Sequence, residues 1–297
     1  MSSNIRKSAR CCKGFSLVEM MIGLTITMIV VGAFINLFIN QSKSYNSESL
    51  REDMYLTGRI ALDEIQREAM NAGTGLPGLF ASVQVRDGGA TEPDTITFLY
   101  VPQTSLHLLF ATSPPPNANA NSMKLSADSD IDSLVEGEQL MIYDESSFNI
   151  IEITSINTSS RTIVFVPPVG VNSPSGLAKA YNPATAVITR VTIMSITVDK
   201  SDADHPTLVK FRGGTSLGEV AYDIENMQTT IIFEDSDTAS AANDADGDDT
   251  NDSMDLRALE VTLTARSSRP DPRYSENADH YYRQEFTSTI APRNVIY

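Results

Sequence analysis

The stretch Gly14-Phe15-Ser16-Leu17-Val18-Glu19, followed by an apolar run that extends to Ile39, decides how the rest of this chain is organised. A short leader rich in Lys and Arg precedes it, and the next basic residue after it is Lys43. Between residues 15 and 39 the only charged side chain is Glu19. A helix of that length spans the roughly 30 Å hydrocarbon core of a bilayer. The sequence therefore predicts one transmembrane helix over residues 15–39.

The flanking charges predict how this helix is oriented. Arg6, Lys7, Arg10 and Lys13 lie on its amino-terminal side, so the positive-inside rule predicts a cytoplasmic amino terminus and an exported body. A secretory signal carries its small-residue cleavage site after the apolar core, whereas Gly14 precedes it here. Cleavage at Gly14 would remove residues 1–14 as a leader and leave the helix on the mature protein.

Glu19 is the most informative residue of the helix. A carboxylate inside a membrane helix costs about 2.5–3.5 kcal/mol unless it has a partner. Cleavage before Phe15 would create an amino group that is cationic, and such a group on a neighbouring helix could pair with Glu19. The alternative is a side chain that reaches toward the membrane surface and water. The spacing from Gly14 favours pairing between subunits, which would set their axial register.

This segment resembles the processing site of type IV pilins and of type II secretion pseudopilins. The resemblance rests on Gly14, the aromatic Phe15, the carboxylate at Glu19 and the apolar run. It implies cleavage after Gly14 by prepilin peptidase and N-methylation of Phe15. It also implies that Glu19 guides assembly into a filament.

Composition excludes several other classes of protein. The chain has 297 residues and a formal charge of -16, so a broad basic surface for nucleic acid is not expected. Both cysteines, Cys11 and Cys12, lie in the leader. A mature chain that begins at Phe15 would therefore have no disulfide, no thiolate metal site and no cysteine nucleophile.

The helix is predicted to continue beyond the membrane as an amphipathic segment over residues 40–73. Its apolar or small residues recur every three or four positions on one face. They are Leu50, Met54, Gly58, Ala61, Ile65, Ala69 and Ala72. This stripe consists mostly of small residues, which favours packing on a globular domain over a free coiled coil. The glycine-rich stretch that begins at Gly73 ends the helix.

Residues 74–297 are predicted to form a β-rich body, which makes the fold α+β with a mainly antiparallel sheet. Short runs rich in Ile, Val, Thr and Phe alternate with turn residues. The expected strands are 82–86, 95–101, 106–110, 139–143, 149–156, 162–166, 186–198, 207–211, 228–234, 256–266 and 283–290. Residues 220–227 are predicted as a short helix and Gly213-Gly214-Thr215 as a hairpin tip. The size of the body suggests two sheets or an inserted subdomain near residues 80–185.

An acidic loop over residues 234–255 is a candidate calcium site. Asp244, Asp246 and Asp248 alternate around Gly247, and Ca²⁺ prefers six to eight oxygen ligands. The match to an EF-hand loop is incomplete, because its first and last ligand positions are Ala242 and Ser253. The alternative is a solvated acidic loop, which is what most acidic runs are.

No residue pattern indicates catalysis. His107, His205 and His280 lack a second His or Cys at ligand spacing, and neither a Gly-x-Ser-x-Gly motif nor a P-loop is present. We therefore expect a protein that is not an enzyme.

The carboxyl-terminal third has a second resemblance, to PilW-type minor pilins, which are similar to the J-type pseudopilin of type II secretion. It rests on residues 220–237, the acidic loop, residues 256–266, residues 282–286 and Arg293-Asn294. The resemblance implies a minor pilin that primes or tips a type IV pilus. Its partners would be other minor and major pilins, prepilin peptidase and the inner-membrane assembly platform. The alternatives are a J-type pseudopilin and, from another class, a monomeric tethered periplasmic protein with a binding or hydrolytic domain.

Overall fold

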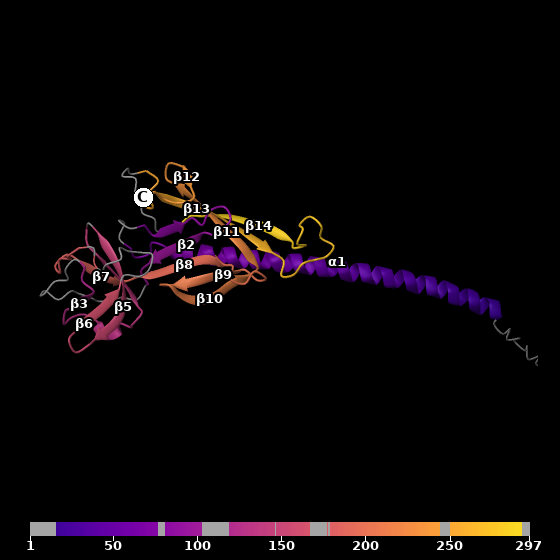
Figure 1. Ribbon diagram of the computed structural model, residues 1–297, viewed down its shortest axis with the longest axis horizontal. Helices are drawn as coiled ribbons and strands as arrows, with labels where there is room; N and C mark the ends of the chain where they lie inside the picture. The colour runs from indigo at the N-terminus through magenta and orange to yellow at the C-terminus, as the bar shows by residue number, and fades with distance from the viewer. Residues whose placement is uncertain are drawn as a thin grey trace, which may run out of the picture. The chain divides into compact units, whose positions relative to one another are not determined.

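The computed structural model describes residues 16–76, 81–102, 119–145, 147–166, 177, 179–243 and 250–292. One long helix, α1 (Leu17–Asn71), is followed by a body of antiparallel strands, which confirms the predicted α+β class. The chain divides into two compact units, residues 1–51 and 52–297, and α1 continues from the first into the second. The second unit carries all of the strands described below (Figure 1).

The strands of the body form three sheets, in which every neighbouring pair is antiparallel. The first sheet has the order β1 (Val83–Arg86), β2 (Thr95–Tyr100), β8 (Thr192–Asp199), β9 (Thr207–Arg212), β10 (Thr215–Tyr222). The second has the order β12 (Thr238–Ala239), β11 (Ile224–Phe233), β13 (Leu256–Arg266), β14 (Arg283–Ile290). The third has the order β3 (Ser122–Lys124), β6 (Thr162–Val166), β5 (Phe148–Asn157), β4 (Gln139–Tyr143), β7 (Val187–Arg190). A 3-10 turn, η1 (Ile131–Ser133), precedes β4.

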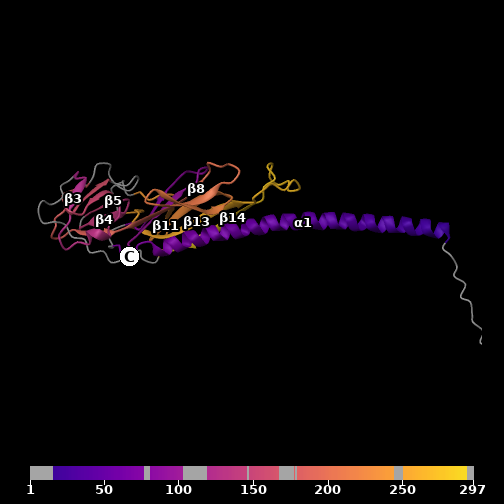
Figure 2. The ribbon, with the colours of Figure 1, turned by 90° about the horizontal axis from the view of Figure 1, so that it is seen from below.

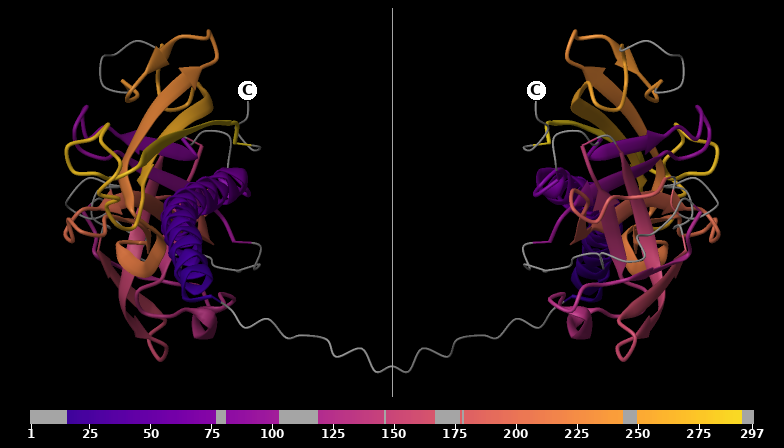
Figure 3. Two further views of the ribbon diagram at one scale, coloured as in Figure 1. Left: turned by 90° about the vertical axis from the view of Figure 1, so that its right-hand side faces the viewer. Right: turned by 90° about the vertical axis from the view of Figure 1, so that its left-hand side faces the viewer.

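The carboxyl-terminal part of α1 packs on the body through the predicted stripe of small residues. Ala61, Ile65, Ala69 and Ala72 are fully buried, and strands such as β11 and β13 lie on one side of this part of the helix (Figures 2 and 3). At Gly58 the contact is so close that an added Cβ would lie 2.4 Å from the ring of Phe286 in β14. The helix segment is therefore part of the folded body, as predicted, and not a free coiled coil.

A charged cluster ties the same helix segment to the first sheet. The Lys210 ammonium on β9 lies 2.8 Å from Glu64 Oε1 and 2.5 Å from Glu68 Oε1. Burial raises the pKa of Glu64, but the hydrogen bond and charge of Lys210, together with Arg67, outweigh that effect and lower the pKa below its usual value. The Tyr100 hydroxyl donates to Glu68 Oε2 at 3.3 Å, and burial together with the Glu68 charge raises the pKa of Tyr100 to about 12.

A buried carboxylate joins the first two sheets. Asp94, which is 1% exposed and lies just before β2, accepts hydrogen bonds from the backbone N–H of Gly88 at 2.9 Å and of Thr229 in β11 at 2.6 Å. Its carbonyl oxygen accepts the hydroxyl of Thr197 in β8 at 2.9 Å. Burial is the largest influence on its pKa and raises it. One side chain thus joins the loop between β1 and β2 to β11, and it satisfies the buried backbone donor of Thr229.

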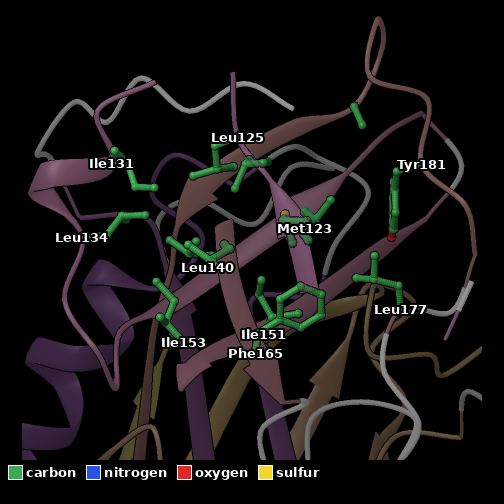
Figure 4. Close-up of a cluster of buried hydrophobic side chains, with 14 residues drawn as sticks. Met123, Leu125, Ile131, Leu134, Leu140, Ile151, Ile153, Phe165, Leu177 and Tyr181 are labelled. Atoms are coloured by element: carbon green, nitrogen blue, oxygen red, sulfur yellow. The ribbon is translucent and has the colours of Figure 1, made fainter. Parts of the chain in front are cut away.

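The third sheet has a hydrophobic core of its own. Residues from its strands, from η1 and from the segment before β7 gather there, as Figure 4 shows. Ile131, Leu140, Ile153 and Phe165 are at most 2% exposed. A smaller cluster, which includes Leu99 of β2 and Met141 of β4, connects this sheet to the first.

The structure corrects several predicted elements. The predicted helix over Val220–Met227 is wrong, because these residues belong to β10 and β11, which meet at Asp223 with a φ of 58°. The single strand predicted over 186–198 is two strands in different sheets, separated by Val191. Strands β3, β10 and β12 were not predicted, and the predicted strand 106–110 lies outside the described residues. Gly213-Gly214 is a hairpin tip, as predicted.

The sheet prediction was right in outline only. The third sheet and its core occupy residues 122–190, a shorter range than the predicted insertion. Strands β1 and β2, which lie inside the predicted range, belong to the first sheet together with β8, β9 and β10. The insertion is therefore made after β2 and closes before β8.

Replacing Gly58 by alanine should destabilise the protein although alanine is the better helix former. The methyl group would enter the space that the Phe286 ring occupies, and overpacking costs about 1–3 kcal/mol, more than the gain in helix propensity of roughly 0.5–1 kcal/mol. Urea unfolding of the full chain in detergent micelles would measure the change. Adding Phe286→Leu to Gly58→Ala should recover part of the loss. If Gly58→Ala alone were more stable than the parent, this packing would be contradicted.

Lys210→Met should lower the free energy of unfolding by about 3–5 kcal/mol at neutral pH, because it leaves Glu64 and Glu68 partly buried without their cation. Because the pKa of Glu64 is lowered in the folded state, its contribution is present above the unfolded pKa and is lost as the pH falls through the folded one. The difference between variant and parent should therefore shrink below about pH 4.5. Unfolding curves at several pH values would show this.

Lys200→Met is the matched control for that variant. Lys200 pairs at 3.7 Å with the exposed Glu92, and such surface pairs contribute only about 0–1 kcal/mol. Equal losses in the two variants at neutral pH would contradict the role given to Lys210.

Candidate functional site

The candidate site is the first turn of α1 and the apolar helix that follows it. Helix α1 begins at Leu17, directly after Ser16, and Met20 N donates to Ser16 O at 3.1 Å. The Ser16 backbone N–H faces Glu19 Oε2 at 3.5 Å. Ser16 and Glu19 thus take the N-cap and N3 positions of a capping box, in which the carboxylate satisfies a backbone donor at the helix start. The Ser-x-x-Glu spacing signals this local role, which was not predicted from the sequence.

The large apolar side chains of the helix from Leu17 to Ile39 are all exposed, by 41% to 77%. Leu17 is 77% exposed, Phe34 67% and Phe38 74%. Such a continuous apolar surface is not stable in water and has to be covered by lipid or by other helices. Among the described residues, α1 is also the helix long and apolar enough to cross a membrane.

Polar side chains within this surface differ in their hydrogen bonding. Thr25 donates to Met21 O at 2.7 Å and Thr27 donates to Gly23 O at 2.8 Å, so both hydroxyls are paired within the helix. The hydrogen bond found for Glu19 within the described residues is the weak one from the Ser16 backbone N–H. The nearest basic residue that follows it, Lys43, lies 24 positions away, or about 36 Å along the helix. In the described part of its own chain Glu19 therefore has no cation within reach.

Two predicted site residues, Gly14 and Phe15, lie outside the described residues, so their processing stays a prediction. The same holds for the candidate calcium ligands Asp244, Asp246 and Asp248. The flanks of the acidic loop are described: Glu234 N donates to Asp255 O, and Asn243 N donates to Asn251 O, both at 3.0 Å. Over the described residues, no three His, Cys, Asp or Glu side chains gather as a metal site would require.

The histidines that can be placed take part in local contacts. His205 Nδ1 lies 3.0 Å from Asp223 Oδ1, and His280 Nδ1 lies 2.5 Å from the carbonyl oxygen of Tyr274. His107 lies outside the described residues. The His205 contact joins the start of β9 to the turn between β10 and β11, and the His280 contact shapes the loop between β13 and β14.

The comparison with protein families finds one match. Residues 9–35 match the model of the prokaryotic N-terminal methylation motif, which spans the predicted cleavage point, Phe15 and Glu19. The comparisons with curated proteins and with solved structures found no match.

The match and the helix agree in what they indicate. The motif is the signal of type IV pilins and pseudopilins, which prepilin peptidase processes and which assemble with other pilins. The apolar helix that follows it fits a membrane-anchored protein. Residues 9–35 of this chain therefore carry the signal of type IV pilin-like or pseudopilin precursors.

Calcium binding by the acidic loop can be tested directly. If Asp244, Asp246 and Asp248 converge on Ca²⁺, isothermal titration of the full chain in detergent should show binding with a Kd of about 0.1–1 mM, as in extracellular modules. Asp246→Ala should abolish the heat, whereas Asp128→Ala, an exposed carboxylate elsewhere, should leave it unchanged. Absence of heat at millimolar Ca²⁺ would mean that the loop is merely solvated.

Proposed function

We propose that the protein is a minor pilin of the PilW type, a structural subunit that primes or tips a type IV pilus. The observation that carries this proposal is Glu19, an ionised group in the first turn of an otherwise apolar and exposed helix. A tether that only anchors a domain gains nothing from a charge that costs about 2.5–3.5 kcal/mol in the membrane. A subunit that has to find its register against neighbouring helices does gain from it.

In this proposal, cleavage after Gly14 frees the amino group of Phe15, which is then N-methylated. That cation pairs with Glu19 of a neighbouring subunit and not with Glu19 of its own chain. The contact from Ser16 N to Glu19 supports this assignment, because one carboxylate oxygen lies near the helix start while the carboxylate keeps its negative charge for a partner. A charge-assisted bond in an apolar surrounding is strong because water does not compete for it.

The body supports a structural role. Its titratable clusters, such as Lys210 with Glu64 and Glu68, tie elements of the fold together. The residues for which we noted the PilW resemblance include β11 and β13 and the beginning of β14, three neighbouring strands of the second sheet. We therefore propose that the protein is not an enzyme. We also propose that the second sheet displays the surface by which other pilins recognise subunits of this type.

The proposed location follows from the charges around the helix. The basic leader keeps the amino terminus in the cytoplasm, and the body faces the periplasm before assembly carries it to the pilus and the cell surface. The proposed partners are prepilin peptidase, the inner-membrane assembly platform and other minor and major pilins.

The test separates the two uses of Glu19. Glu19→Gln keeps a capping side chain but removes the charge, and Glu19→Ala removes both. We expect both variants, and Gly14→Ala, to abolish pilus assembly as seen by electron microscopy, with Gly14→Ala also leaving the unprocessed precursor on immunoblots. Thr25→Ala, which loses only a hydroxyl bonded within the helix, is the matched control and should assemble normally.

Other outcomes favour the alternatives. If Glu19→Gln assembles like the parent and Glu19→Ala does not, capping and not charge pairing is the role of Glu19. Normal pili in all variants would favour a monomeric tethered protein. Normal pili with lost export of secreted proteins would favour a J-type pseudopilin of type II secretion.

A further inference from the structure

A cavity of about 560 Å³ lies where the chain passes from the third sheet to the first. Its walls are the loop Val135–Gln139 before β4, the junction Arg190–Thr192 between β7 and β8, and the β9–β10 hairpin around Arg212 and Gly213. This volume lies within the range of about 300–1,000 Å³ that small-ligand sites occupy, and such sites favour junctions between substructures. The proposed role in the pilus uses none of these residues.

The hairpin forms a fixed wall of the cavity. Gly213 has a φ of 55°, and its N–H donates to Ile193 O at 3.0 Å. A Cβ at this position would lie 2.0 Å from Gln139 Nε2, so the amide of Gln139 occupies the place that any side chain would need. Because the third sheet carries Gln139 and the first sheet carries Gly213, this contact holds the two sheets together at the cavity.

Gln139 also carries a donor with no partner. The residue is 5% exposed, and its Nε2 makes no hydrogen bond with any described residue. Its backbone is satisfied, since Val191 N donates to Gln139 O at 3.1 Å. A buried amide N–H without an acceptor is costly, and an acceptor oxygen on a ligand in this cavity would remove that cost.

The two arginines of the cavity differ in their pairing. Arg190 is held by Glu138, and its Nη2 also donates to Ser133 O at 2.5 Å. Arg212, at the end of β9, is exposed and forms no ion pair or hydrogen bond through its side chain with the described part of the chain. An unpaired guanidinium presents a planar fork of donors that matches a carboxylate.

The rim of the cavity is partly apolar. Val135, in the loop before β4, is 65% exposed and Leu217, in β10, is 51% exposed, and both line the cavity. These side chains offer a surface for the uncharged part of a ligand, while Arg212 and Gln139 supply the polar contacts.

We propose that this cavity binds a small ligand that carries a carboxylate. Arg212 would receive the carboxylate through two parallel hydrogen bonds, and Gln139 Nε2 would donate to a second acceptor of the same ligand. The body of the ligand, of monosaccharide or dipeptide size, would lie against Val135 and Leu217. An acidic sugar and the carboxyl terminus of a peptide share this chemistry, and the experiment separates them.

Isothermal titration of the full chain in detergent micelles tests the proposal with two matched pairs of probes. One pair is D-galacturonate and neutral D-galactose, and the other is N-acetyl-alanyl-alanine and its carboxyl-terminal amide. We expect the carboxylate of one pair to bind with a Kd of about 1 mM or tighter and its neutral counterpart to bind at least tenfold more weakly. The pair that responds identifies the source of the carboxylate.

Three variants place the binding in this cavity. Arg212→Gln should weaken binding at least tenfold, and Arg212→Lys should do so less, since it keeps the charge but not the fork. Gln139→Leu should weaken binding as well. Because Gln139 is buried, urea unfolding should show that this variant is still folded under the conditions of the titration. Arg257→Gln, an exposed arginine on β13, is the control and should bind like the parent.

Three results would overturn the proposal. They are no heat from either carboxylate at about 10 mM, equal binding of charged and neutral probes, and equal losses in Arg212→Gln and Arg257→Gln. None of these results depends on whether the protein assembles into pili, so a failure here leaves the proposed function untouched.

Discussion

The close approach of α1 to the strands is the contact on which the body depends. Gly58 lies under the Phe286 ring with no room for a methyl group, and Ala61, Ala69 and Ala72 continue the same face without exposure. Small side chains bury less apolar area than large ones, but they allow the helix to lie closer to the sheet. Those distances bring Glu64 and Glu68 onto Lys210, so the ion cluster is a consequence of the packing. A helix with larger residues on this face would hold its carboxylates away from β9.

The amino-terminal part of α1 is also helical, but its apolar side chains are exposed and do not pack on strands. From Leu17 to Ile39 its side chains face outward on all sides, and the hydroxyls of Thr25 and Thr27 are paired with the helix backbone. Glu19 is the charged side chain of this segment, and its contact with Ser16 N satisfies only one of its oxygens. A capping residue at the start of a membrane helix does not have to be charged, because a glutamine side chain can cap as well. The charge is therefore the feature that calls for an explanation outside the chain.

Much of the fold could be predicted because the residues that decide it act locally. The strands 139–143, 162–166, 256–266 and 283–290 have the predicted bounds, since alternating or continuous apolar runs between turn residues suffice to define them. The errors fall where the chain changes sheets. At Val191 the apolar pattern runs on without a turn residue although the strand ends, and at Asp223 one left-handed residue separates β10 from β11. Tertiary pairing with β13 then overrides the local helix propensity of residues 220–227.

For a related reason, the residues that line the cavity between the third and first sheets could not be predicted from the sequence. Gln139, Arg190 and Arg212 are separated by 51 and 22 positions, and each is unremarkable beside its neighbours. They meet because the chain inserts a complete sheet after β2 and returns at β8, which places the loop before β4 next to the β9–β10 tip. Gly213 was predicted only as part of a hairpin tip. Its lack of a side chain also leaves room for the Gln139 amide. An insertion that merely enlarged the body would need neither a buried amide without an acceptor nor an unpaired arginine at its junction, and over the described residues this junction has both. Their presence together is what distinguishes this junction from ordinary packing between sheets.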